Sequence, residues 1–229
     1  MVQPCSATEV RVLAKHTLGR RKGTWGEKGI ANKPRGVSSL VIDTLCKQAV
    51  GRSAAVACFY FDFAAQEEQS PAAVLGSVLK QVVRGLSEIP ETIVKAFREG
   101  EKVIGGQRLA LPEIVGFLQD ISSSRCTFIC IDALDECLTE HRVKLLNSLN
   151  QIVQESPGAR IFLTGRQHIL DEVKKRLAGR ATTRSITPTK DDIVTFLRAK
   201  LKEDTTPDAM DESLGEEIIK NIPETVSEM

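Results

Sequence analysis

Apolar residues recur along this 229-residue chain with two different periods, and the change of period predicts its elements. Helical spacing, with apolar residues three or four positions apart, predicts helices over about 37–50, 71–86, 90–97, 112–121, 138–155, 169–177 and 190–201. Short continuous apolar runs predict buried strands over about 54–63, 127–131, 160–164 and 183–186. Helices that alternate with buried strands are typical of an α/β fold, in which helices cover both faces of a parallel sheet.

The first 36 residues differ from the rest of the chain. They lack a sustained apolar period, and they carry eight Lys or Arg residues against two acidic ones. Glycine and proline interrupt them repeatedly, which is typical of irregular chain. We therefore expect an irregular basic N-terminal segment over 1–36, an α/β core over 37–187, and the start of a helical segment over 188–229.

Composition narrows the classes of protein. A net charge of +1 gives no global electrostatic case for binding nucleic acid or a membrane. The longest apolar run, Ala54–Phe61, is too short to span a bilayer, and the N-terminus lacks the apolar core of a secretory signal. Its basic character leaves a weak organelle-targeting alternative open. The six cysteines form no C-x-x-C pair, so we expect reduced thiols and a cytoplasmic protein.

Charged residues follow two of the expected strands where each strand ends. Asp132 comes directly after the apolar run Thr127–Ile131, and Asp135 and Glu136 follow within one turn. Ligands bind beyond the carboxyl ends of the strands in an open parallel sheet, so Asp132 is placed to hold a magnesium ion. Asp135 or Glu136 could orient or deprotonate an attacking water. Arg166 closes the next strand and could contact a terminal phosphate.

Each of these residues also has a structural alternative. Asp132 could cap the helix that begins near Asp135, and acidic residues are favoured by the dipole at a helix N-terminus. Arg166 could be an exposed loop arginine.

Several segments together resemble the NACHT domains of fungal signalling proteins, which are nephrocystin-like members of the STAND class of P-loop NTPases. The sequence F-Y-F-D-F-A at 59–64 precedes Ser70-Pro71, and D-A-L-D-E-C at 132–137 precedes T-G-R at 164–166. The resemblance extends from about Ser38 to the C-terminus. It implies a P-loop NTPase-like parallel sheet flanked by helices, with a helical segment that begins near Pro188.

The resemblance also implies roles for individual residues. Asp132 would be the Walker B acid that holds Mg²⁺, with ATP or GTP as the nucleotide. Asp135 or Glu136 would orient the attacking water, and Arg166 would be the sensor arginine.

The phosphate-binding loop of such a domain is not intact in this sequence. A G-x-x-x-x-G-K-[ST] sequence before the first helix supplies backbone amides and a lysine to the phosphates. Residues 26–36 read G-E-K-G-I-A-N-K-P-R-G, and Pro34 follows Lys33 where Ser or Thr is expected. Gly26, Gly29 and Lys33 could form a degenerate cradle, or the loop has been lost or replaced. In both cases we expect impaired nucleotide binding.

Two functional hypotheses follow. The first is a NACHT/STAND-type nucleotide-binding signalling domain that uses Mg²⁺ with ATP or GTP and hydrolyses slowly. The second is a non-enzymatic NACHT-like remnant or scaffold that acts through protein–protein contacts. A P-loop kinase is a poorer fit, since no lid or substrate-binding signature is visible. Expected partners are nucleotide and proteins, and not nucleic acid or membrane. Relatives continue into helical and repeat regions beyond the point that corresponds to Met229, which predicts a truncated member.

Overall fold

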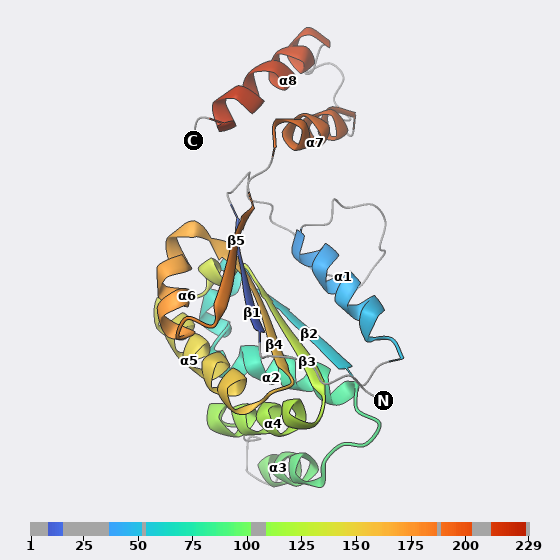
Figure 1. Cartoon of the computed structure of the whole chain (residues 1–229), viewed down its shortest axis with the longest axis vertical. Helices are drawn as coiled ribbons and strands as arrows, with labels where there is room; N and C mark the ends of the chain where they lie inside the picture. Colours follow the sequence, from blue (N-terminus) through green and yellow to red (C-terminus); the bar gives the residue numbers. More distant parts are fainter. Residues whose placement is uncertain are drawn as a thin grey trace. The chain divides into compact units, whose positions relative to one another are not determined.

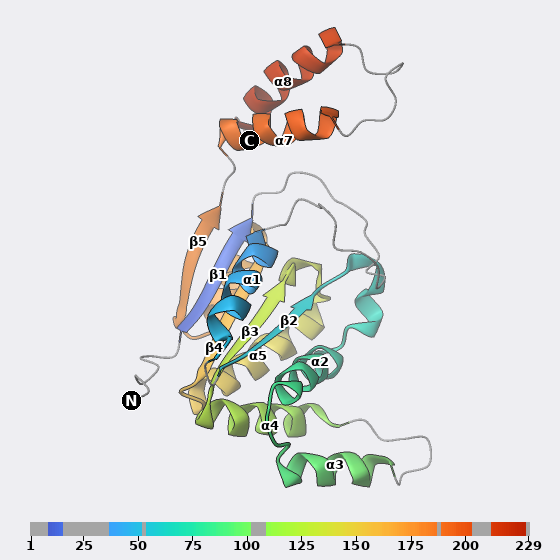
Figure 2. The same cartoon turned by 90° about the vertical axis from the view of Figure 1, so that its right-hand side faces the viewer.

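A five-stranded sheet forms the centre of the larger unit. The computed structural model describes residues 9–15, 37–51, 54–101, 109–186, 189–202 and 212–227. The strands stand in the order β2-β3-β4-β1-β5, and the pairs β2–β3, β3–β4 and β4–β1 are parallel (Figures 1 and 2). Their bounds are β1 Glu9–Lys15, β2 Ala54–Tyr60, β3 Cys126–Asp132, β4 Ala159–Arg166 and β5 Ala181–Ile186.

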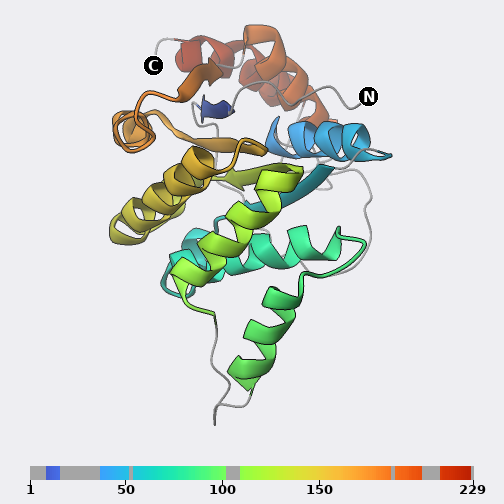
Figure 3. The ribbon, with the colours of Figure 1, turned by 60° about the horizontal axis from the view of Figure 1, so that its bottom comes forward.

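Helices cover both faces of this sheet. They are α1 Val37–Ala49, α2 Pro71–Arg84, α4 Leu111–Ser124, α5 Thr139–Glu155 and α6 Leu170–Arg176. A further helix, α3 (Glu91–Glu101), lies beyond α4, away from the sheet (Figures 1 and 2). The step from β1 to β2 crosses the sheet in one direction, whereas the steps from β2 to β3, β4 and β5 run in the other. Right-handed crossovers therefore place α1 on one face and α2, α4, α5 and α6 on the opposite face. Figure 3 shows this separation.

The hydrophobic core lies between the sheet and the larger group of helices. Side chains alternate between the two faces of a strand. In β2, β3 and β4 the odd-numbered positions face this core: Ala57, Ile129 and Leu163 are completely buried, and Phe59 is partly buried against it. The even-numbered positions face α1. This alternation brings Tyr60, Asp132 and Thr164, at the ends of three strands, to the α1 face.

The predicted α/β class and most predicted elements agree with the structure, within a few residues at the ends. α2 shows the local reason clearly. Ser70 caps it by accepting a hydrogen bond from the Ala73 N–H (3.3 Å), and Pro71 occupies its first position, where a missing N–H costs nothing.

The prediction of irregular chain over 1–36 was wrong for Glu9–Lys15. These residues form β1, which pairs with β4 along its whole length, from Glu9 opposite Arg160 to Lys15 opposite Arg166. Charged and apolar residues alternate only over Glu9–Val12, which is too short a pattern to predict a strand. Its pairing with β4 is a non-local interaction that no local pattern contains.

The chain divides into two compact units between Ser185 and Ile186. The second unit contains α7 (Lys190–Lys202) and α8 (Glu212–Ser227). Thr189 begins α7 by a reciprocal cap: its N–H and hydroxyl donate to Asp192 Oδ2 (2.9 and 2.7 Å), and its hydroxyl accepts from the Asp192 N–H (3.2 Å). None of the helices in the described part of the chain is long and apolar enough to cross a membrane.

One stability prediction arises at the turn between α5 and β4. A Cβ at Gly158 would overlap the carbonyl oxygens of Ser122 and Arg125, which are backbone atoms and cannot rotate away. We expect Gly158→Ala to lower the free energy of unfolding by about 3 kcal/mol, measured by urea denaturation. Gly116→Ala is the matched control, because a Cβ there meets nothing within 4 Å and α4 should gain about 0.5–1 kcal/mol. Equal stability of the two variants would contradict the close packing of this turn.

Candidate functional site at the strand ends

Asp132 is the centre of a polar cluster on the α1 face of the sheet. Its Oδ1 accepts hydrogen bonds from the hydroxyls of Ser38, in the first turn of α1, and Thr164, near the end of β4. The Thr164 hydroxyl also accepts from the Ala133 N–H (3.1 Å). Ser38 and Thr164 are 2% and 1% exposed, so these contacts are shielded from water. The cluster joins the start of α1 to the ends of β3 and β4.

Tyr60 borders this cluster from β2, where it stands in register with Asp132. Burial, followed by the neighbouring Cys58, raises the pKa of Tyr60 to about 12, although a hydrogen bond with Ser39 acts in the opposite direction. The phenol is therefore protonated at neutral pH.

The backbone turns sharply after Asp132. Ala133 has φ 56° and ψ 43°, the left-handed conformation, and a short helical turn over Leu134–Glu136 follows. This conformation costs a non-glycine residue about 1–3 kcal/mol. It redirects the chain so that Asp135 and Glu136 leave the Asp132 cluster and meet other partners.

Asp135 pairs with Arg166. Its Oδ1 accepts from the Arg166 N–H (3.2 Å) and its Oδ2 lies 3.2 Å from Arg166 Nε. The Asp135 side chain is only 7% exposed, whereas that of Arg166 is 38% exposed. Both carboxylate oxygens of Asp135 are thus engaged by one arginine, whose far end reaches solvent.

Glu136 holds the segment that follows β2. Its Oε2 accepts from the Phe63 N–H (3.1 Å), and its backbone carbonyl accepts from Gln66 Nε2 (2.7 Å). Phe63 begins a short helical turn, Phe63–Glu68. The carboxylate therefore caps that turn in this structure.

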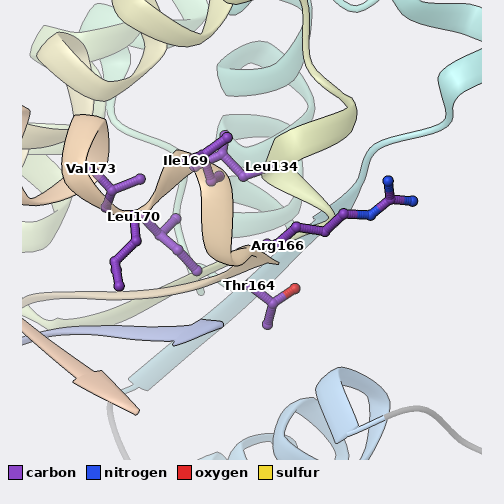
Figure 4. A pocket seen from close by; sticks show the side chains of 8 residues that line it. Leu134, Thr164, Arg166, Ile169, Leu170 and Val173 are labelled. Carbon is purple, nitrogen blue, oxygen red and sulfur yellow. The ribbon is translucent and has the colours of Figure 1, made fainter. Parts of the chain in front are cut away.

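A small cavity lies beside these residues, behind the end of β4. Apolar side chains of Leu134, Ile169, Leu170 and Val173 line it, and in Figure 4 Arg166 extends away from them. Its volume of about 10 Å³ is room for roughly one water molecule, so this cavity cannot hold a nucleotide.

Of the residues predicted from the sequence, the structure pairs Asp135 with Arg166, whereas Asp132 and Glu136 each have other partners. The other two predicted residues, Gly29 and Lys33, lie outside the described residues. Ser38 and Thr164 are contacts of Asp132 that the sequence reasoning missed. A signal was available for Thr164, because it has the same place at the end of β4 that Asp132 has at the end of β3.

The donor set suits a magnesium ion. Among the described residues no group of three or more His, Cys, Asp or Glu could hold a metal. Magnesium that arrives with a nucleotide does not require such a group, because one or two carboxylates, water and phosphates complete its octahedron. Asp132 and Ser38 supply oxygen atoms of the kind that magnesium prefers.

Fold and site together define an α/β protein with a carboxylate–hydroxyl cluster at the carboxyl ends of a parallel sheet. The model of the family described as "Nephrocystin 3, N-terminal" matches residues 37–166, more than half of the chain. The chain belongs to this family. A search of curated protein sequences finds no match.

Solved structures show distant likenesses. They include the Orc1 protein of Aeropyrum pernix in complex with DNA (18% identity, TM-score 0.46), a Walker-type ATPase of Pyrococcus abyssi (15%, 0.46) and Cdc6p of Pyrobaculum aerophilum (11%, 0.48). The matches cover 73%, 96% and 86% of this chain, and 40%, 61% and 44% of those chains. The chain therefore spans less than two thirds of their length, and family membership rests on the sequence match alone.

Proposed function

We propose that this chain is a NACHT-type nucleotide-binding domain of the P-loop NTPase class. It binds ATP or GTP weakly, together with Mg²⁺, and hydrolyses the nucleotide slowly. The observation that carries the proposal is the pair of hydrogen bonds that the Ser38 and Thr164 hydroxyls donate to Asp132. These hydrogen bonds connect the start of α1 to the ends of β3 and β4. Family membership supports the same assignment.

Ser38 has the position and the contact expected of the hydroxyl in a G-x-x-x-x-G-K-[ST] sequence. It lies at the start of the helix after β1, and it bonds to the acid that ends β3. Bound Mg²⁺ would neutralise phosphate charge, with Asp132 and Ser38 as its protein ligands. Thr164 would hold Asp132 in place, and Arg166 would offer its exposed guanidinium to a phosphate group.

This placement of Ser38 changes how the loop is aligned. If Ser38 is the hydroxyl position, Gly36 stands at the second glycine, Ala31 at the first glycine, and Val37 at the lysine. Lys33 then lies within the variable stretch and is not the phosphate-binding lysine. The valine side chain has no charge and no hydrogen-bond donor, so the positive charge that the lysine of this loop supplies to the outer phosphates is missing. Weak affinity follows.

Slow turnover follows from the partners of the two candidate bases. Asp135 is bonded by Arg166 through both carboxylate oxygens, and Glu136 accepts from the Phe63 N–H. A general base must reach a water beside the phosphate. Each acid would first have to leave its partner, which favours binding over hydrolysis.

A scaffold that acts only through protein contacts is the alternative, and the replacement of lysine by Val37 favours it. In both proposals the protein works in the cytoplasm in a signalling role with protein partners, and not on nucleic acid or a membrane.

A thermal-shift titration tests the proposal. Since a ligand that binds only the folded state stabilises it by RT ln(1 + [L]/Kd), even a weak ligand raises the melting temperature at millimolar concentration. We expect MgATP or MgGTP to raise the melting temperature. Magnesium without nucleotide should leave the melting temperature unchanged. If neither nucleotide shifts the melting temperature, nucleotide binding is contradicted and the scaffold function remains.

A further inference from the structure

Arg142 is a nearly buried arginine that the site described above does not use. It lies in the first turn of α5 and is 8% exposed. A buried charge is costly, and a cation near a helix N-terminus is also opposed by the helix dipole. Its place in the fold must therefore be stabilised by its partners.

Those partners lie in the segment that follows β3 and in α6, the helix that follows β4. Arg142 Nη1 donates to the Cys137 carbonyl oxygen (2.9 Å), and Nε lies 2.9 Å from Glu172 Oε2. Nη2 makes a long contact with Thr139 Oγ1 (3.5 Å). Cys137 ends the acidic loop, which we define as Ala133–Cys137. Glu172 lies in α6, just beyond the segment that begins with Arg166.

The acidic loop is thus joined at two points to the segment that runs from the end of β4 into α6. Asp135 in the acidic loop contacts Arg166 at the end of β4, and Arg142 connects Cys137, the last residue of that loop, to Glu172 in α6. The two links differ in exposure: the Arg166 side chain is 38% exposed, whereas that of Arg142 is 9% exposed. Glu172 is 24% exposed, so water also reaches part of the second link, but the hydrogen bond between Arg142 and the Cys137 carbonyl is buried. Water can therefore replace the Arg166–Asp135 contact more easily than the Arg142–Cys137 bond.

We propose that Arg142 is a positioning residue that keeps the acidic loop in place when Arg166 leaves Asp135 to contact a phosphate group. The part that concerns phosphate rests on the proposed function. The Arg166–Asp135 pair is then free to open and close. Arg142 holds the acidic loop through Cys137 and Glu172 whether that pair is open or closed.

Hydrogen exchange of the acidic loop tests this role. The amides of Glu136 and Cys137 are protected by bonds to Ala133 O (2.9 Å) and Leu134 O (3.2 Å). In Arg142→Met we expect these amides to exchange roughly tenfold faster or more, because the loop loses a charge-assisted bond. Arg98→Met, an exposed position in α3, is the matched control and should leave them unchanged.

A double variant separates positioning from simple stabilisation. Replacing both members of a buried ion pair by apolar residues is often neutral for stability, whereas removing one member is not. The double variant Arg142→Met/Glu172→Met should therefore have a higher melting temperature than Arg142→Met, close to that of the unaltered chain. Hydrogen exchange of the acidic loop should stay fast, because the Cys137 carbonyl still lacks its donor. Recovery of both properties would overturn the proposal.

Arg142→Lys covers the case in which the methionine variant does not fold. Lysine keeps the charge but lacks the forked guanidinium that reaches two acceptors. Loop exchange should rise while exchange in α2 stays as in the unaltered chain; unchanged loop exchange would overturn the proposal. These readouts need no nucleotide. If the unaltered chain binds none, the proposed function fails while the exchange data still decide the role of Arg142.

Discussion

Replacing Val37 with lysine should tighten the binding of a fluorescent ATP analogue by about 10- to 100-fold, because a hydrogen bond to a charged group contributes about 1.5–3 kcal/mol. Val37 directly precedes Ser38, whose hydroxyl bonds to Asp132. A lysine at this position of the loop is the one that contacts the outer phosphates. The expected gain in affinity follows from an alignment of the phosphate-binding loop in which Ser38 is the hydroxyl residue and Val37 takes the place of the lysine. An alignment in which Lys33 is the phosphate-binding lysine predicts no such gain.

The control for this substitution is Val50→Lys. Val50 follows the other end of α1 and is 80% exposed, so the same change of residue there adds the same charge away from the strand ends. Fluorescence anisotropy with Mg²⁺ present gives both dissociation constants. An equal effect of the two lysines would show a general charge effect, and no gain from Val37→Lys would place the phosphate site elsewhere.

Asp132→Ala should weaken binding of the same analogue by at least tenfold, and the remaining binding should no longer depend on magnesium. The substitution removes the carboxylate that we assign to the metal, and it leaves the buried hydroxyls of Ser38 and Thr164 without their shared acceptor. Circular dichroism and the melting temperature establish that the variant is folded, so that loss of binding is not loss of structure.

Asp120→Ala is the matched control for this variant. Asp120 is exposed on α4, so the same atoms are removed where no site is proposed. Its dissociation constant should equal that of the unaltered chain. If Asp132→Ala binds as tightly as Asp120→Ala, then Asp132 is a structural residue that fastens α1 to the sheet and has no part in holding a metal.

The helices and most strands could be predicted because each carries its own apolar pattern. The amphipathic α2 and the apolar β3 are local properties of the sequence. β1 could not be found in this way, since Glu9 and Arg11 interrupt a short pattern and its neighbour β4 comes some 150 positions later in the chain. Strand pairing at such distance follows from packing and leaves little local trace.

The candidate site shows a similar division. The acids at the end of β3 and just beyond it, and the arginine that ends β4, were predictable because charged residues at the carboxyl ends of apolar runs are conspicuous. That Asp135 and Arg166 would bind each other was not, since each was assigned a separate role toward a ligand. Ser38 escaped notice because the loop pattern was sought around a lysine, and hydroxyls are common along the whole chain.

The most direct test of nucleotide binding is its dependence on magnesium. The affinity of the unaltered chain for the fluorescent ATP analogue should be measured from EDTA to millimolar Mg²⁺, beside Asp132→Ala. Our account predicts affinity that rises with magnesium in the unaltered chain and stays flat in the variant. Affinity that is independent of magnesium in both, or absent at millimolar nucleotide, would contradict it.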